Sequence, residues 1–285
     1  MPARQRLPSY DAGAGLTCMD VSRVGACADL FEGEVEIEGR IMPASNATFF
    51  GAVVAAGVRV PCVYKPIAGE RPLWDFPDGT LAHREVAAFL VSETLGWDVV
   101  PPTVLREGPA GSGMVQAWRE PDAGQSPVDL VPEGRVPPGY LHVLDAHDQR
   151  DRPISLVHED SDALRRMAVF DVLVNNADRK GGHVLAMTDG HRYGVDHGVS
   201  FHVDDKLRTV LWGWSEQPLR DDERAAIRRL LDQTCTLDSA VRTRLDELLA
   251  GHEVDAFVSR CEWLQAAGRM PAPSGEWPAI PWPAF

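Results

Sequence analysis

The sequence NNADRKGGH occupies positions 175–183 and is the densest polar stretch of this chain. The sequence VDHG follows at positions 195–198, so two acids, Asp178 and Asp196, stand near flexible glycines. A phosphoryl-transfer site needs an acid that accepts the proton of the nucleophile, ligands for a divalent metal ion, and a cation on the nucleotide phosphates. Asp178, Asp196 and the upstream Lys65 are residue types that supply these groups.

The order of these residues along the chain is informative. Lys65 lies on a predicted strand and Glu85 on the next predicted helix, and both precede the acidic loop, which we define as residues 176–183. An Asp-x-Gly sequence begins at Asp196, after that loop. Each of these elements alone is weak evidence for a function. Their order along the chain, however, is that of the kinase superfamily and predicts phosphoryl transfer.

Hydrophobic patterning upstream of the acidic loop predicts an antiparallel sheet with one helix. The helix is expected over residues 80–93, with Thr80 as its cap and Gly96 just beyond its end. The expected strands, rich in Val and Phe or alternating between apolar and polar residues, are 34–41, 48–56, 58–67, 99–106 and 114–118.

The chain after Arg119 has a different character. Residues 120–153 are rich in Pro, Gly, Asp and His with weak periodicity, which is typical of an inter-lobe connection or a surface insertion. Asp171 falls on the apolar face of the next predicted helix, an unusual place for an acid, and we expect it to brace the acidic loop. Further helices are expected over 162–175, 221–231, 239–249 and 252–265, with a strand pair at 183–186 and 193–195.

These patterns predict an α+β protein with two lobes and a tail. The sheet-rich N-lobe is expected over residues 1–119 and the mainly helical C-lobe over residues 120–270. The tail, residues 271–285, is rich in Pro and Trp, and it is expected to wrap the helical lobe or to offer a partner an aromatic peptide. A length of 285 residues fits two units, since about 150 residues is typical of one domain.

Composition narrows the class of protein and its partners. With 44% hydrophobic and 25% charged residues the chain is an ordinary globular protein, which excludes global disorder. Its net charge of -14 argues against nucleic acid and anionic bilayers as partners. The longest apolar run, residues 49–58, is too short to span a membrane, so no integral membrane association is expected. No secretory signal is readable and the five cysteines are scattered, so we expect a cytoplasmic protein.

Five pieces of the chain, in the same order, resemble the phosphatidylinositol 3- and 4-kinase-like family, closest to type II phosphatidylinositol 4-kinases and their small bacterial relatives. The likeness covers roughly residues 45–219 and implies a bilobal protein-kinase-like fold with ATP and Mg²⁺ or Mn²⁺ in the cleft. The pieces are VYKP at 63–66, HREVAAF at 83–89, VPPT at 100–103, the segment from Phe170 to Arg179, and VDHGVSF at 195–201.

The resemblance implies roles on the nucleotide side of the site. Lys65 would contact the α- and β-phosphates while Glu85 holds it in a charge-assisted pair. Trp118 would stack on adenine, although ordinary core packing explains it nearly as well. The hinge that binds adenine corresponds to Gln116, Ala117 and Trp118. The turn that covers the phosphates corresponds to Ser45, Asn46 and Thr48.

The resemblance also implies roles on the catalytic side, with one departure. Asp178 and Arg179 match the catalytic Asp-Arg pair, and Asp196 matches the metal ligand of the family. His183 stands where the family has Asn, and Lys180 is placed to reach the γ-phosphate. An imidazole prefers softer metals than Mg²⁺. We therefore expect one of three consequences: a single metal ion is enough for catalysis, Mn²⁺ is preferred over Mg²⁺, or catalysis is weakened. A catalytically degenerate pseudokinase that binds nucleotide as a regulatory module is therefore the alternative.

The acceptor of the phosphoryl group stays open at this point. The family suggests an inositol lipid, but the chain lacks the Cys-rich membrane-anchoring insertion of the type II lipid kinases, and its charge disfavours an anionic bilayer. A protein Ser/Thr or a soluble polyol fits the charge better. A fold by itself does not select among these hydroxyl acceptors.

Overall fold

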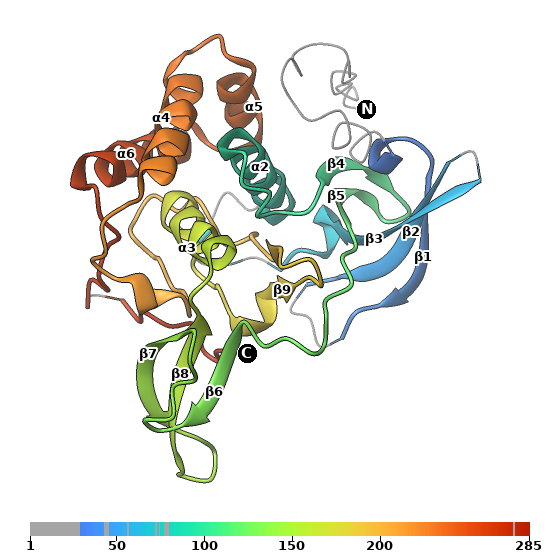
Figure 1. Ribbon diagram of the computed structural model, residues 1–285. Helices are drawn as coiled ribbons and strands as arrows, with labels where there is room; N and C mark the ends of the chain where they lie inside the picture. Colours follow the sequence, from blue (N-terminus) through green and yellow to red (C-terminus); the bar gives the residue numbers. More distant parts are fainter. Residues whose placement is uncertain are drawn as a thin grey trace.

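Alternating apolar residues in the first part of the chain form a five-stranded antiparallel sheet. The computed structural model describes residues 29–42, 46–55, 57–71, 73, 75–76, 80–275 and 277–285. Within them the strand order is β1-β2-β3-β5-β4, as Figure 1 shows. The strands are β1 (Glu34–Arg40), β2 (Phe49–Ala55), β3 (Val58–Pro66), β4 (Thr103–Gly108) and β5 (Gly111–Ala117). The expected strands are confirmed, with ends shifted by a few residues.

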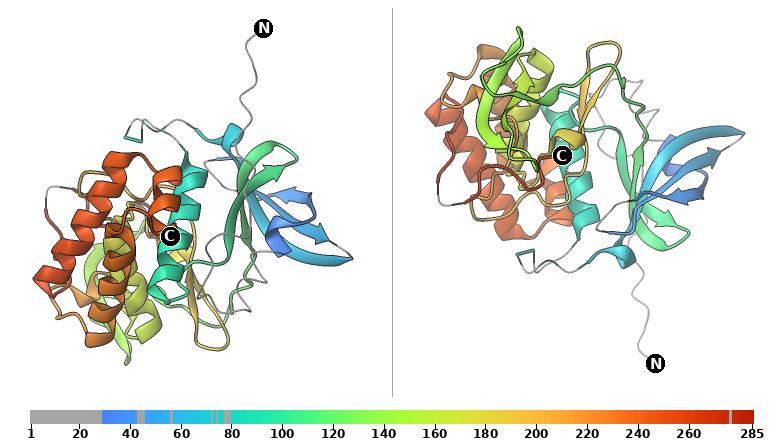
Figure 2. Two further views of the ribbon diagram at one scale, coloured as in Figure 1. Left: turned by 90° about the horizontal axis from the view of Figure 1, so that it is seen from above. Right: turned by 90° about the horizontal axis from the view of Figure 1, so that it is seen from below.

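Helix α2 (Leu81–Leu95) joins this sheet to the rest of the molecule. It packs against β4 and β5 on one side and against α4 (Asp221–Cys235) and α5 (Ala240–Leu248) on the other. The two views of Figure 2 show α2 between the sheet and the C-terminal helices. A residue on α2 can therefore reach both parts of the protein.

The start of α2 corrects one expectation. Thr80 makes no capping hydrogen bond through its side chain, because its backbone is left-handed, with φ of 60°, and not extended as an N-cap residue requires. The carboxylate of Glu70 accepts hydrogen bonds from the N–H groups of Leu81 and Ala82 at 3.0 and 2.8 Å. At the other end Gly96 is left-handed and ends the helix, as predicted.

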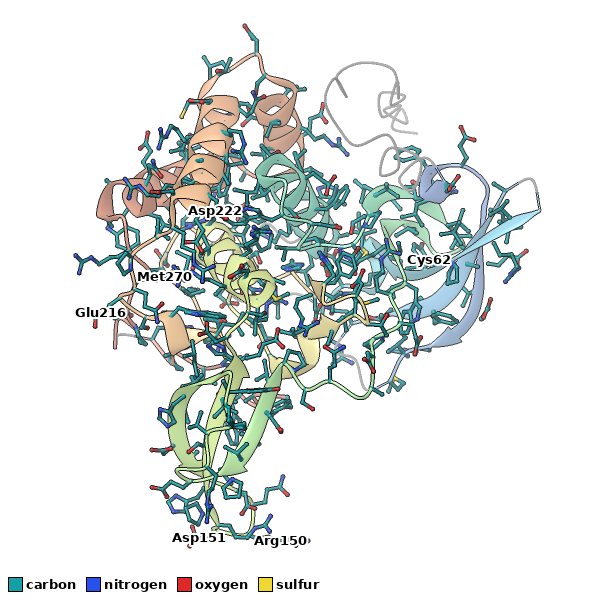
Figure 3. All side chains as sticks on the ribbon, in the orientation of Figure 1. Cys62, Arg150, Asp151, Glu216, Asp222 and Met270 are labelled. Carbon is teal, nitrogen blue, oxygen red and sulfur yellow. The ribbon has the colours of Figure 1, made fainter. Side chains whose placement is uncertain are left out.

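The region after Arg119 has more regular structure than its sequence suggested. It contains a three-stranded antiparallel sheet, in the order β6-β8-β7, that projects from the helical part (Figure 1). Arg150 and Asp151 lie at its far tip (Figure 3). The strands are β6 (Val128–Pro132), β7 (Tyr140–His147) and β8 (Pro153–Glu159). Their alternation is weak because β6 is mostly exposed, β7 has no fully buried residue, and only β8 has a continuous buried stretch.

The C-terminal part is mainly helical, as predicted. Helix α3 (Asp162–Val174) is buried along most of its length, and α4, α5 and α6 (Gly251–Ala267) pack around the same hydrophobic core. Ser161 caps α3 by accepting a hydrogen bond from the Leu164 N–H, and the helix begins at Asp162, as the sequence suggested. A short hairpin, β9 (Val184–Ala186) with β10 (Arg192–Gly194), follows the acidic loop. No helix among the described residues is both long and apolar enough to cross a bilayer.

His158 on β8 gives the fold a predicted pH dependence. The ring is fully buried, its Nδ1 lies 2.9 Å from the Glu159 carbonyl oxygen, and the Gly213 N–H donates to its Nε2 at 3.0 Å. Both bonds suit a neutral imidazole, and burial lowers the pKa of His158. Below pH of about 6.5 the unfolded chain therefore binds a proton that the folded protein does not.

We expect the free energy of unfolding to fall as the pH drops below about 6.5, by at most about 1.4 kcal/mol per pH unit for this one proton. The variant His158→Gln should show a shallower slope in urea denaturation between pH 7.5 and 5. His147→Gln, at an exposed position of β7, is the matched control and should keep the wild-type slope. An unchanged slope in His158→Gln would contradict the argument.

Candidate active site

Lys65 stands at the meeting point of three elements. Its Nζ, near the end of β3, lies 2.7 Å from Oε1 of Glu85 on α2 and 2.8 Å from Oδ1 of Asp196, which follows β10. The second oxygen of Glu85 accepts a hydrogen bond from the His197 N–H at 2.9 Å. One glutamate thus holds the lysine and, at the same time, the backbone beside Asp196.

The charges in this cluster stabilise one another. Burial opposes the charge on Lys65, but Asp196 and Glu85 outweigh it and raise the pKa of the ammonium. The Lys65 ammonium in turn lowers the pKa of Asp196. Asp196 also has a left-handed backbone, with φ of 63°. Such a conformation is costly for a residue other than glycine and persists where the surroundings enforce it, often at functional sites.

Arg179 does not face the cleft, although the resemblance had grouped it with the catalytic residues. Its side chain is fully buried, and its guanidinium donates to both carboxylate oxygens of Asp171 at 2.9 to 3.2 Å. It also donates to the carbonyl oxygens of His183 and Val195. Arg179 therefore contacts neither the cleft nor a substrate there; with Asp171, as expected of that acid, it braces the acidic loop from inside.

The acidic loop turns Asp178 and Lys180 toward the cleft. Lys180 Nζ lies 3.0 Å from Asp178 Oδ2, and both side chains are about one quarter exposed. The Asp178 N–H donates to Oδ1 of Asn176 at 3.0 Å, which holds the backbone of the acid. Asp178 is thus an accessible carboxylate on a fixed backbone, with an ammonium beside it.

His183 and Asp196 are the residues that would hold a metal ion. His183 Nδ1 lies 2.9 Å from the Asp178 carbonyl oxygen, so this nitrogen carries the proton and Nε2 keeps its lone pair. Nε2 faces Asp196 Oδ2 at 3.4 Å, and burial lowers the pKa of His183, which favours the neutral ring. No group of three or more His, Cys, Asp or Glu ligands gathers around one point among the described residues. The pair fits a divalent ion only if other oxygens complete its coordination.

The cleft contains two adjoining cavities that share Asn46, Lys65 and Asp196. The first, of about 570 Å³, is lined by residues of the predicted hinge together with Lys180 and His183. The second, of about 660 Å³, is lined by Asp178, by Trp277 of the predicted tail, and by residues that sequence reasoning did not single out: Glu70, Arg71, Asp75 and Arg208. These residues come from separate segments and form no local pattern, so no signal in the sequence could have found them.

The predicted hinge lines the first cavity, but part of its hydrogen bonding is already used. The Ala117 N–H donates to Pro102 and the Trp118 N–H to Pro61, at 2.8 and 2.9 Å. The side chain of Gln116 turns to Thr103 Oγ1. Adenine would therefore need other hinge groups than these two N–H groups. The Trp118 ring contacts Phe50 edge-on at 5.1 Å and also lines the cavity, so it packs and remains available to a ligand.

The predicted phosphate-covering turn is described only in part. Ser45 lies outside the described residues. Asn46 and Thr48 line the first cavity. Asn46 Oδ1 accepts a hydrogen bond from the Arg71 N–H, and Thr48 Oγ1 donates one to the Asn46 carbonyl oxygen.

No protein-family model matches this chain. The chain is 50% identical over 267 residues to Protein Rv2133c of Mycobacterium tuberculosis, and the match covers 90% of this chain and 95% of that protein. The chain belongs to the Rv2133c family. The name of Rv2133c states no activity, so membership of the Rv2133c family does not identify a reaction.

One solved structure, that of the Helicobacter pylori proinflammatory kinase CtkA, is similar to this chain at 12% identity. The match covers 83% of this chain and 98% of that chain, with a TM-score of 0.37. A similarity at that level carries no argument about this member of the Rv2133c family. The contacts in the cleft have to carry the functional inference.

Because Asp171 and Arg179 form a buried ion pair, we predict that Asp171 matters for stability more than Asp178 does. Removing one partner of a buried ion pair leaves the other charge unpaired, at a cost of about 3–5 kcal/mol. Asp171→Ala should therefore lower the free energy of unfolding by that amount in urea denaturation. Asp178→Ala, which removes a partly exposed acid of the same loop, should cost about 1 kcal/mol or less. Equal losses in the two variants would contradict the bracing role.

Proposed function

We propose that this protein is an ATP-dependent phosphotransferase that moves the γ-phosphoryl group to a hydroxyl acceptor. One observation carries the proposal: the ammonium of Lys65 lies between Glu85 and Asp196, in a cleft that Asp178 also lines. The proposal includes a bilobal protein-kinase-like arrangement, with the five-stranded sheet as the N-lobe and the helical part as the C-lobe.

The first cavity is the place for the nucleotide. Lys65, shared by both cavities, would bind the phosphates, and its pair with Glu85 keeps the ammonium where negative charge develops during transfer. Asp196 and His183 would hold a divalent ion, which when bound neutralises charge on the phosphate oxygens. The mixed carboxylate and imidazole pair favours Mn²⁺ over Mg²⁺.

Asp178 is the residue that would accept the proton. The acceptor oxygen bonds to the γ-phosphorus, the bond from that phosphorus to the bridging oxygen breaks, and ADP leaves with the electron pair. The acceptor proton passes to the Asp178 carboxylate, which lines the second cavity. Lys180 pairs with Asp178 in the structure and also lines the nucleotide cavity, so it can turn to the γ-phosphate when ATP binds and free the acid.

A second candidate is a nucleotide-binding pseudokinase that regulates a partner without catalysing transfer. Two observations favour it. His183 and Asp196 supply only two protein ligands for a metal ion, and the Asp178 carboxylate is already paired with the Lys180 ammonium. In either case the acceptor or partner is unidentified. A protein Ser/Thr, a soluble polyol and an inositol lipid all carry the required hydroxyl.

The two candidates are separated by turnover. Purified protein with γ-labelled ATP and Mg²⁺ or Mn²⁺ should release or transfer label, and Asp178→Ala should lower that rate by about 100-fold or more. Lys65→Ala should in addition weaken ATP binding, followed as ATP-dependent thermal stabilisation. Arg150→Ala, at the tip of the β6-β8-β7 sheet, is the control and should behave as wild type (Figure 3).

The other outcomes are equally decisive. Thermal stabilisation by ATP without turnover in either metal would support the pseudokinase. A protein that neither binds nor turns over ATP would overturn both candidates.

The metal preference gives a further prediction. His183→Asn replaces the imidazole by an amide whose oxygen is a harder ligand, which suits Mg²⁺ better. We expect the ratio of the rate in Mg²⁺ to the rate in Mn²⁺ to rise in this variant, measured by label release at saturating metal. A ratio equal to that of the wild type would mean that His183 does not bind the ion.

A further inference from the structure

The end of the tail lies directly on the acidic loop. The Gly181 N–H donates to the Ala284 carbonyl oxygen at 2.8 Å. The ring of Phe285 covers Gly181 so closely that a methyl group built on this glycine would overlap the ring. Three residues of the loop line the nucleotide cavity: Lys180, Gly182 and His183. Gly181 lies among them in the sequence.

A second connection runs through residues 206–210. The Arg208 N–H and Nε donate to the carbonyl oxygens of Asn176 and Ala177, at 3.0 and 2.7 Å. On the other side of this segment the Thr209 N–H donates to the Ala279 carbonyl oxygen at 3.0 Å. The indole of Trp277 lies beneath two cations, Lys206 Nζ at 5.1 Å and Arg208 Cζ at 5.8 Å. Residues 206–210 thus lie between the loop and the tail and contact both.

The two supports of the loop act on different parts of it. The pair of Asp171 and Arg179 anchors the loop from the interior, at its buried arginine. The tail holds the loop from outside at Gly181, next to the side chains that face the nucleotide cavity. A displacement of about 1 Å in groups that orient reactants can cost about 100-fold in rate, so the second support matters for chemistry even if the fold does not need it.

We infer that residues 277–285 are a positioning element of the active site, and that Phe285 and Ala284 set where Lys180 and His183 stand. The effect on catalysis rests on the proposed phosphotransferase function, whereas the docking of the tail on the loop does not. Phe285 is about half exposed, at 48%, so its removal leaves the hydrophobic core intact. Ala284 and Phe285 touch the loop at Gly181 and line neither cavity of the cleft, so they act through Lys180 and His183.

Two neighbouring glycines give a matched pair of variants. Neither Gly181 nor Gly182 has a positive φ, so alanine fits the backbone at both positions. A methyl group at Gly182 meets nothing within 4 Å, whereas at Gly181 it meets the Phe285 ring. Gly181→Ala should displace the tail and Gly182→Ala should leave it docked. Phe285→Ala removes the ring directly, and Gly181→Ala with Phe285→Leu makes room for the methyl group while keeping an apolar cover.

Amide hydrogen exchange tests the docking without any assay of activity. The amides of residue 181 and Thr209 should exchange faster in Gly181→Ala and Phe285→Ala, at a wild-type rate in Gly182→Ala, and at an intermediate rate in the double variant. Thermal unfolding midpoints check that all variants remain folded. Equal exchange in Gly181→Ala and Gly182→Ala, or wild-type exchange in Phe285→Ala, would overturn the inference.

Kinetics test the consequence for the reaction. In Phe285→Ala, kcat for label release should fall by about 10- to 100-fold with a smaller change in the KM for ATP, and Phe285→Leu should retain most of the wild-type kcat. Faster exchange with an unchanged kcat would overturn the positioning role. If the wild-type protein has no turnover while the exchange pattern holds, the proposed function fails and the docking of the tail on the loop stands.

Discussion

One ammonium group, that of Lys65, organises the candidate site. It comes from a strand, and its two carboxylate partners come from a helix and from a loop beyond β10. An amine in a cleft keeps its charge only if acids lie close to it, and acids in a cleft need a cation in return. The cluster therefore ties the five-stranded sheet to the helical part beside the two cavities of the cleft.

The rest of the site is built to hold backbone segments still around that cluster. Asp171 and Arg179 form a fully buried pair that carries the acidic loop on α3. Similar buried pairs connect the helices, with Arg84 of α2 bonded to Glu253 of α6 and Arg165 of α3 to Glu223 of α4. Pairs of this kind contribute little net stability compared with apolar packing, but they permit few alternative arrangements. A loop that must present Asp178, Lys180 and His183 to a cleft benefits from that constraint.

Local patterns in the sequence predicted most of the helices and strands. They failed for an exposed sheet and for one helix cap. The strands of the large sheet and helices α2 to α6 follow from apolar periodicity, and Gly96 ends α2 as its type suggests. The β6-β8-β7 sheet was missed because β6 is mostly exposed and β7 has no fully buried residue, so both strands alternate weakly. Thr80 was expected to cap α2, but Glu70 does so from a preceding turn.

The sequence by itself determined which chemical groups are present and in what order: Lys65, Glu85, the acidic loop with Asp178, and Asp196. Periodicity and residue type act over a few neighbours, so they can be read along the chain. Only the tertiary structure decided that Arg179 turns inward, that the Ala117 and Trp118 N–H groups are occupied, and that Phe285 covers Gly181. Those contacts join residues distant in sequence, and they form only when packing of the whole core brings the segments together.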